Sequence, residues 1–140
     1  RIYVYEDHVE IKVKADIVDR DERESGERRK LNLGHTFAHA IEKCSSEMNH
    51  GEAVAVGTVM ISRMAVKLGL LQAEKADRIE RAMERLGFRT SAPVETKKLL
   101  KAIAKDKKSV ADSIYLVLPT DIGHCEVRKM HIDEIAACTE

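Results

Sequence analysis

The chain has 140 residues, and its 24 basic and 24 acidic side chains cancel to a formal net charge of zero. This balance argues against a general nucleic-acid binder or membrane-surface protein, so an anionic ligand would need a local cluster of cations. The length predicts a single domain. Hydrophobic residues make up 44% of the sequence but aromatic residues only 4%, which predicts a core of Ala, Val, Ile, Leu and Met.

The first expected element covers residues 5–19. Its apolar residues alternate as in a strand, but Val9, Val13 and Ile17 also have helical spacing. We favour a helix here, because charged residues fill the gaps and the stretch is long for a strand. Residues 19–28 are highly charged, which indicates a surface loop or a break between helices.

Two apolar helices are expected next, over about 34–45 and 51–68. Asn32 is a plausible N-cap for the first helix, and Gly69 is placed to end the second. Gly57 lies inside the second helix, where glycine is unfavourable. We therefore expect Gly57 to allow another backbone to approach closely.

The rest of the chain predicts three shorter helices and a hairpin. Apolar residues at helical spacing indicate helices over about 73–86, 96–105 and 131–138. The segments 114–118 and 125–128 read as a small β-hairpin around a Gly-containing turn. The expected fold is therefore mainly α, a helical bundle with one small β-hairpin.

The three cysteines, Cys44, Cys125 and Cys138, are widely spaced and form no CxxC pair. This pattern favours reduced thiols in a cytoplasmic protein over a disulfide framework. No apolar run reaches the ~18 residues that a membrane span requires, and no signal-peptide pattern is present. The sequence starts at Arg1 rather than Met, which we interpret as a sign of a fragment.

Three of the six histidines lie within sixteen residues. His35 and His39 are four residues apart, so a helix places them on the same face, and His50 opens the next apolar segment. Two helices that meet near these neutral imidazoles would form half of a zinc site. The alternative is that the histidines are structural, because a pair at i, i+4 is weak on its own.

A longer pattern surrounds these histidines. RRKLNLGHTFAHAIE at 28–42, with HGEAVA at 50–55, resembles the C-terminal domain of the 3-dehydroquinate synthases. The resemblance includes DERESGER upstream and DKK downstream, so it extends from about Lys14 to Lys108. One departure is Ala38, where the family usually carries Gly, and its methyl group could tighten packing near His39.

The resemblance implies a reaction and a fold. Members of this family convert 3-deoxy-D-arabino-heptulosonate 7-phosphate to 3-dehydroquinate and phosphate in the shikimate pathway, with zinc, for which cobalt could substitute, and NAD. They are similar in fold to the glycerol dehydrogenases, with a nucleotide-binding α/β domain followed by a helical domain. We expect residues 1–140 to form only the second of these domains, since the sequence contains no Gly-rich phosphate-binding turn after a strand.

The same resemblance implies roles for individual residues. His35 and His50 match zinc ligands, while His39 and Glu24 match catalytic positions for proton transfer. The positions that match substrate-binding residues are Lys14, Arg28, Asn32 and Lys108, with Lys107 as the alternative to Lys108. Glu52 could orient a ligand or support the first helical turn, and we favour the second role.

The resemblance also implies partners. NAD and a third zinc ligand, a glutamate, would belong to an N-terminal domain that is missing here, and the full-length protein would be a homodimer that binds neither nucleic acid nor a membrane. We expect this chain alone to be inactive. The alternatives are another zinc- and NAD-dependent sugar phosphate cyclase or a non-catalytic helical binding module; a zinc peptidase is poorly supported because HEXXH is absent.

Overall fold

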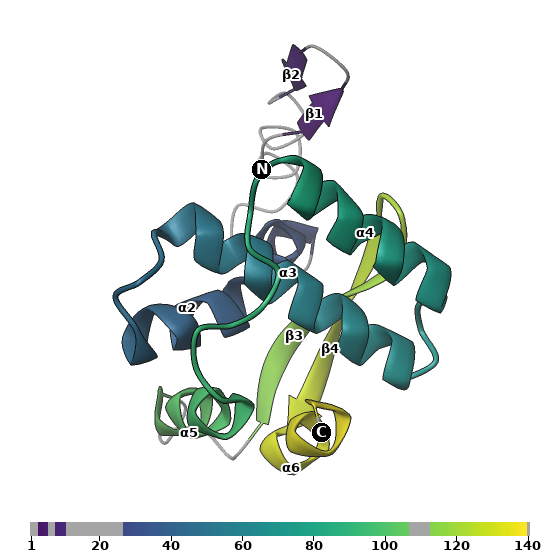
Figure 1. Cartoon of the computed structure of the whole chain (residues 1–140). Coiled ribbons are helices and arrows are strands. Elements are labelled where there is room, and N and C mark those ends of the chain that lie inside the picture. The colour runs from purple at the N-terminus through teal and green to yellow at the C-terminus, as the bar shows by residue number, and fades with distance from the viewer. Residues whose placement is uncertain (1–2, 6–7, 11–26, 107–112, 140) are drawn as a thin grey trace.

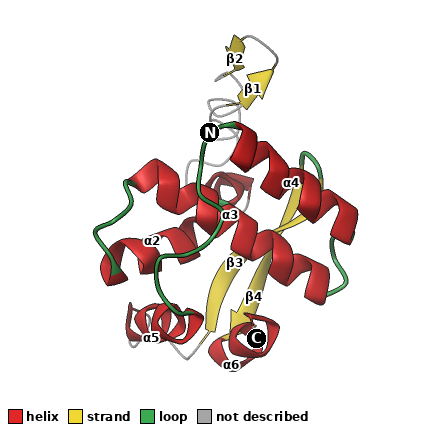
Figure 2. Ribbon diagram, viewed as in Figure 1, coloured by secondary structure: helices red, strands yellow, loops and turns green. Residues whose placement is uncertain are grey.

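The computed structural model describes residues 3–5, 8–10, 27–106 and 113–139. Figure 1 labels the elements and Figure 2 separates helices from strands by colour. The elements, in chain order, are β1 (Tyr3–Tyr5), β2 (His8–Glu10), the 3-10 helix η1 (Glu27–Asn32), α2 (His35–Cys44), α3 (His50–Lys67), α4 (Ala73–Arg85), α5 (Thr96–Asp106), β3 (Ser113–Asp121), β4 (His124–His131) and α6 (Ile132–Thr139).

Helix α3 is the centre of the fold. It packs against α2, α4, α6 and strand β3, and Figure 1 shows it crossing the middle of the molecule in front of the hairpin. Most of its side chains are buried, including Val56, Ile61 and Met64. The buried core is built from Ala, Val, Ile, Leu and Met, with Phe37 as its one aromatic residue among those described, as the composition predicts.

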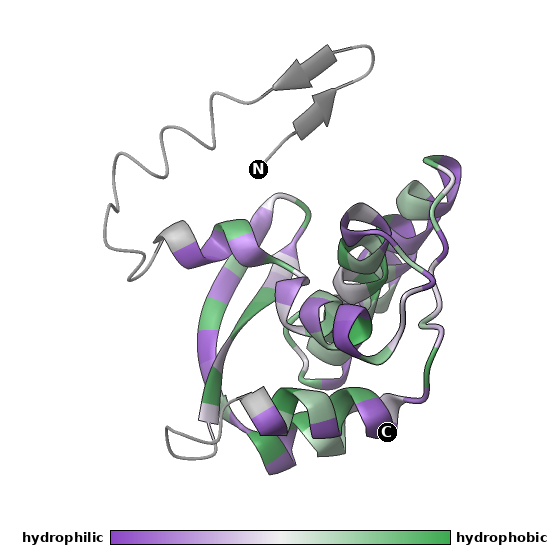
Figure 3. Cartoon of the chain, turned by 90° about the vertical axis from the view of Figure 1, so that its left-hand side faces the viewer, coloured by the Kyte–Doolittle hydropathy of each residue, from purple (hydrophilic) through white to green (hydrophobic). Residues whose placement is uncertain are grey.

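Strands β3 and β4 form the antiparallel hairpin that the sequence predicts. They pair from Ser113 with His131 to Asp121 with His124, with an irregularity between Pro119 and Asp121. Figure 3 shows hydrophobic and hydrophilic residues interspersed along this hairpin, and the buried ones include Ile114, Leu116 and Leu118 of β3. The side that carries the apolar residues covers the helical core.

Glycines bring α2 and α3 into close contact. A Cβ atom on Gly57 would lie 2.2 Å from the carbonyl oxygen of Gly34 and 3.0 Å from the amide nitrogen of Ala38. Only a residue without a side chain fits at this crossing, so the expected close backbone approach at Gly57 is confirmed. The Ala38 side chain is itself fully buried on α2.

The helices predicted over 51–68, 73–86, 96–105 and 131–138 are confirmed within one or two residues at their ends. None of the described helices combines the length and apolar character needed to cross a lipid bilayer. All three cysteines are free thiols, as their spacing indicates.

Two expectations were wrong. The helix predicted over 5–19 is not formed where the chain is described: β1 and β2 pair there as antiparallel strands, so the period-two pattern prevails over the helical one. Residues 11–19 lie outside the described part. Asn32 does not cap α2, because it ends η1, and Gly34 holds the cap position with no side-chain hydrogen bond.

Candidate metal centre

His35 is the first residue of α2, and His39 lies one turn later on the same face. Gly34 precedes them with a φ angle of 78°, a left-handed conformation that turns the chain from η1 into α2. The contact of Gly34 with Gly57 and Thr58 then fixes this turn against the middle of α3. The position of His35 therefore depends on the α2–α3 crossing.

His50 is the first residue of α3 and reaches the same place from the other helix. The side chain of Asn49 accepts a hydrogen bond from the amide of Glu52 at 2.9 Å, and the Glu52 carboxylate accepts one from the amide of Asn49 at 2.9 Å. This capping box fixes the helix start one residue before His50. Glu52 thus supports the first turn of the helix, which is the role that we favour for it.

The three imidazoles form one cluster. The ring centroids of His35 and His50 are 5.5 Å apart, and His39 lies 5.8 Å from His35 and 6.4 Å from His50. The structure therefore brings together the three histidines that the sequence singled out, from two helices.

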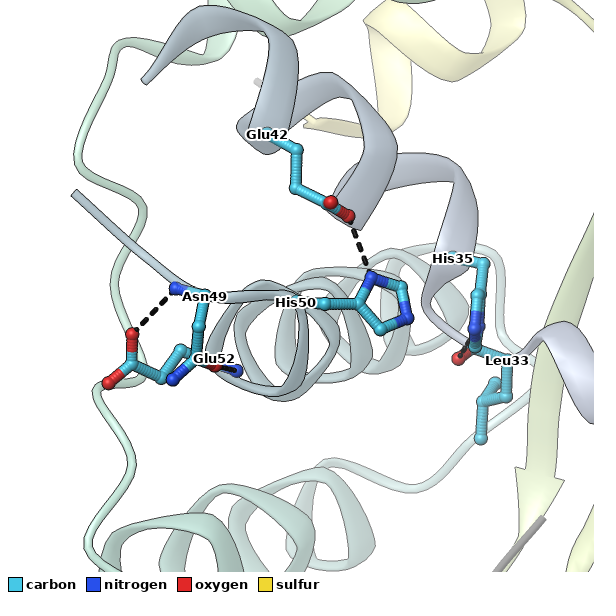
Figure 4. A network of polar contacts seen from close by, with 6 residues as sticks. All are labelled: Leu33, His35, Glu42, Asn49, His50 and Glu52. Carbon is cyan, nitrogen blue, oxygen red and sulfur yellow. Dashed lines mark hydrogen bonds and ion pairs between the residues drawn. The ribbon is translucent and has the colours of Figure 1, made fainter. Parts of the chain in front are cut away.

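Each ring of the closer pair is held at Nδ1. His35 Nδ1 lies 3.2 Å from the carbonyl oxygen of Leu33, and His50 Nδ1 lies 2.9 Å from Glu42 Oε1 (Figure 4). Both partners are acceptors, so Nδ1 donates and the lone pair of each ring is on Nε2. Metal-binding histidines typically donate their second ring nitrogen to a carbonyl or carboxylate in this way.

The environment of His35 favours its neutral form. Burial lowers the pKa of His35, and the nearby His39 and His50 lower it further, while the hydrogen bond to the Leu33 carbonyl acts in the opposite direction. A lowered pKa keeps a nitrogen lone pair available at neutral pH. This is the form that can bind a cation.

The spacing of the closer pair fits a shared metal ion. With Zn–N bonds of about 2.0–2.1 Å in a tetrahedral arrangement, two imidazole centroids are expected about 5 Å apart, close to the 5.5 Å between His35 and His50. Within the described residues, no group of three His, Cys, Asp or Glu side chains is arranged to hold a metal ion. The two histidines therefore supply part of a coordination sphere, and His39 stands beside it.

The remaining residues predicted for the site are placed unevenly. Arg28 and Asn32 both belong to η1, the segment that leads directly to His35, and Asn32 is exposed at its end. The other predicted residues, Lys14, Glu24, Lys107 and Lys108, lie outside the described residues.

Glu42 was not among the site residues predicted from the sequence. This carboxylate is seven residues after His35 and three after His39, so helical spacing alone places it on the same face of α2. The signal was therefore present in the sequence. What the sequence did not reveal is that His50, on the next helix, lies within hydrogen-bond distance of it.

Comparison with known proteins agrees with the sequence pattern. Residues 8–109 match the family model described as 3-dehydroquinate synthase C-terminal. The 3-dehydroquinate synthase of Xylella fastidiosa (strain M12) is 45% identical over 122 residues, which covers 81% of this chain and 33% of the relative. That of Crocosphaera subtropica (strain ATCC 51142 / BH68) is 40% identical over 120 residues, covering 83% and 33%. The chain thus spans about a third of the length of these relatives.

Solved structures of sugar phosphate cyclases share the fold. ValA, a 2-epi-5-epi-valiolone synthase from Streptomyces hygroscopicus subsp. jinggangensis 5008 with NAD+ and Zn2+ bound, matches with a TM-score of 0.75 and 27% identity over 91% of this chain and 36% of its own. A 2-deoxy-scyllo-inosose synthase complexed with carbaglucose-6-phosphate, NAD+ and Co2+ matches with a TM-score of 0.76 and 20% identity, covering 92% and 39%. Because the family model covers most of its length, this chain belongs to the family of 3-dehydroquinate synthase C-terminal domains.

Proposed function

We propose that this chain is the metal- and substrate-binding domain of a 3-dehydroquinate synthase. The full-length enzyme would be a phosphate-eliminating lyase that converts 3-deoxy-D-arabino-heptulosonate 7-phosphate to 3-dehydroquinate in the cytoplasm. The observation that carries the proposal is the convergence of His35 and His50, from two helices, in a chain that is 45% identical to a named synthase.

His35 and His50 would hold the metal, zinc, through their Nε2 atoms. Their Nδ1 atoms are already engaged by Leu33 and Glu42, which orients both lone pairs before any ligand arrives. When bound, zinc and NAD supply Lewis-acid and hydride-transfer chemistry at a substrate hydroxyl. The work of the protein side chains is to bind and orient the substrate and to move protons.

His39 is the proposed proton-transfer residue. It is exposed, and its ring lies beside those of His35 and His50. A histidine can both accept and donate a proton near neutral pH, which suits a step beside the phosphate of the substrate. Glu24 is proposed as a second proton acceptor.

Substrate binding is assigned to the cationic and amide side chains that match substrate-binding positions of the family. Arg28 and Asn32 lie on η1, which ends shortly before His35 at the start of α2. Arginine offers a forked set of donors that suits a phosphate or carboxylate group. Lys14 and Lys108 are proposed to complete the anion-binding set, with Lys107 as the alternative to Lys108.

The remaining parts of the enzyme are proposed to lie outside these 140 residues. The relatives are about three times as long as the matched region, and the two solved structures carry NAD+ and a divalent metal. We assign NAD binding and the third metal ligand to a preceding domain, and a homodimer to the full-length protein. The 140-residue chain alone is expected to show no synthase activity.

A second candidate is another sugar phosphate cyclase with the same cofactors. The similarity to ValA, at 27% identity, is the observation that favours it. The two candidates differ in their substrates: the heptulosonate carries a carboxylate at C1 that a plain heptulose phosphate lacks. Binding of that carboxylate requires an additional cation.

The test is phosphate release by the full-length protein in the presence of zinc and NAD. We expect turnover of the heptulosonate phosphate and at least a hundredfold lower kcat/KM with a heptulose 7-phosphate, since leaving a charged site unpaired costs about 3 kcal/mol. Preference for the heptulose phosphate would support the second candidate, and no turnover of either substrate would refute both.

A further inference from the structure

We propose that Glu42 is a positioning residue that fixes the tautomer and orientation of His50 for metal binding. The proposal rests on the metal-binding function proposed above. It assigns a role to a carboxylate on α2 that the proposed function leaves unused.

The contact between Glu42 and His50 joins the two helices of the site. Glu42 Oε1 accepts a hydrogen bond from His50 Nδ1 at 2.9 Å. In Figure 4 the His50 ring lies between Glu42 and His35, with one nitrogen toward the carboxylate and the other turned toward His35. The hydrogen bond therefore directs Nε2 of His50 toward the other proposed ligand.

His50 depends on this hydrogen bond more than His35 depends on its own. The His50 side chain is 58% exposed and that of Glu42 36% exposed, so packing does little to restrict the ring. His35, by contrast, is partly buried and is held by a backbone carbonyl. An exposed ring can occupy several rotamers, and a charge-assisted hydrogen bond selects one of them.

The carboxylate also selects the tautomer. An ionised glutamate can only accept hydrogen bonds, so the proton of a neutral His50 ring must be on Nδ1 and the lone pair on Nε2. Without Glu42 the form protonated at Nε2 would compete, and that form has no lone pair facing His35. Loss of the carboxylate should therefore weaken metal binding even though every proposed ligand remains.

Zinc titration of the full-length protein against a chromophoric chelator tests this role. Partners of this kind are typically worth a factor of 10–100 in metal affinity, so we expect Glu42→Ala to raise the zinc Kd by about 10- to 100-fold. Glu42→Gln should lose less, because its amide oxygen can still accept from Nδ1. Glu52→Gln is the matched control: it removes a charge two residues from His50 but keeps the capping box, and its Kd should stay within about threefold of wild type.

Nitrogen-detected NMR of the His50 ring in the metal-free protein gives a readout independent of zinc. We expect the Nδ1-protonated form in the wild type and in Glu52→Gln, and a shift toward the Nε2-protonated form in Glu42→Ala. A residue that only stabilised the fold would leave the tautomer unchanged. The thermal unfolding midpoints of all variants show whether the fold is intact.

The outcomes separate this proposal from the proposed function. Zinc binding by the wild type with an unchanged Kd in Glu42→Ala overturns the positioning role and leaves the metal site intact. Absence of zinc binding by the wild type overturns the metal site and the role of Glu42 with it. An equal loss of affinity in Glu42→Ala and Glu52→Gln would also overturn the proposal, because it would show a nonspecific effect of charge.

Discussion

Replacing Gly57 by alanine should push α2 and α3 apart and disturb the histidine pair. The added Cβ would lie 2.2 Å from the carbonyl oxygen of Gly34, whereas a carbon and an oxygen rarely approach closer than about 3.3 Å. The obstacle is backbone, so relief requires a helix shift of about 1 Å. Because Gly34 immediately precedes His35, the shift moves that ring relative to His50.

Two opposing terms set the size of the effect. Alanine is favoured over glycine inside a helix by about 1 kcal/mol. Overpacking in a close contact costs about 1–3 kcal/mol and more when the neighbour cannot rotate away. We therefore expect Gly57→Ala to lower the free energy of unfolding by about 2 kcal/mol and to weaken zinc binding at least tenfold.

Urea denaturation and zinc titration of the full-length protein measure both effects. Gly51→Ala is the matched control, because it lies on the same helix and its added Cβ would meet, among the described residues, only the Asn49 side chain, at 3.5 Å. The control should be as stable as the wild type or slightly more stable. If Gly57→Ala proved as stable as Gly51→Ala and bound zinc equally well, the argument that this crossing positions His35 would be refuted.

Three further predictions concern the site and its supports. His39→Asn should lower kcat by about 10²–10⁴-fold while the zinc content stays at the wild-type level; loss of zinc would make His39 a ligand instead. Asn49→Ala removes the side-chain cap of α3 and should cost about 1 kcal/mol in urea denaturation, against no loss for Ser46→Ala in the preceding loop. The fold lowers the pKa of His35 below its ordinary value of 6.5. As the pH falls, His35 is therefore protonated in the unfolded chain before it is protonated in the folded one. The metal-free protein should thus lose stability as the pH falls below about 6.5. His35→Gln should remove that part of the pH dependence, and an identical slope in both proteins would contradict it.

Much of the fold follows from local patterns in the sequence. The helical spacing of the apolar residues in α4 and the long apolar run of α3 identify these two helices, because α4 buries one face and α3 most of its surface. Gly57 was informative for a physical reason: glycine destabilises the interior of a long apolar helix, and a close crossing of two backbones offsets that cost.

The start of α2 could not be predicted in this way. Asn32 has the right chemistry for a cap, but the chain forms a 3-10 turn there and reaches α2 through Gly34 in the left-handed region. Gly34 lies against Thr58 and Gly57 of α3, where a side chain at position 34 would not fit. Short-range rules for capping do not include such a contact.

The histidines were recognised from the sequence, but their supports were not. Helical spacing places His35 and His39 on one face, and only the fold shows that His50 joins them at 5.5 Å from His35. The hydrogen bond from His50 to Glu42 spans eight residues and two helices, so it depends on the packing angle between them. The packing angle between two helices cannot be predicted from the spacing of residues along the sequence.

The most direct test of the central claim is the zinc content of the full-length protein and of its His35→Ala and His50→Ala variants after dialysis. Convergence of the two histidines on one ion predicts one zinc per chain in the wild type and loss of zinc in each variant. Retention of one zinc per chain in either variant would contradict the claim that both histidines are ligands.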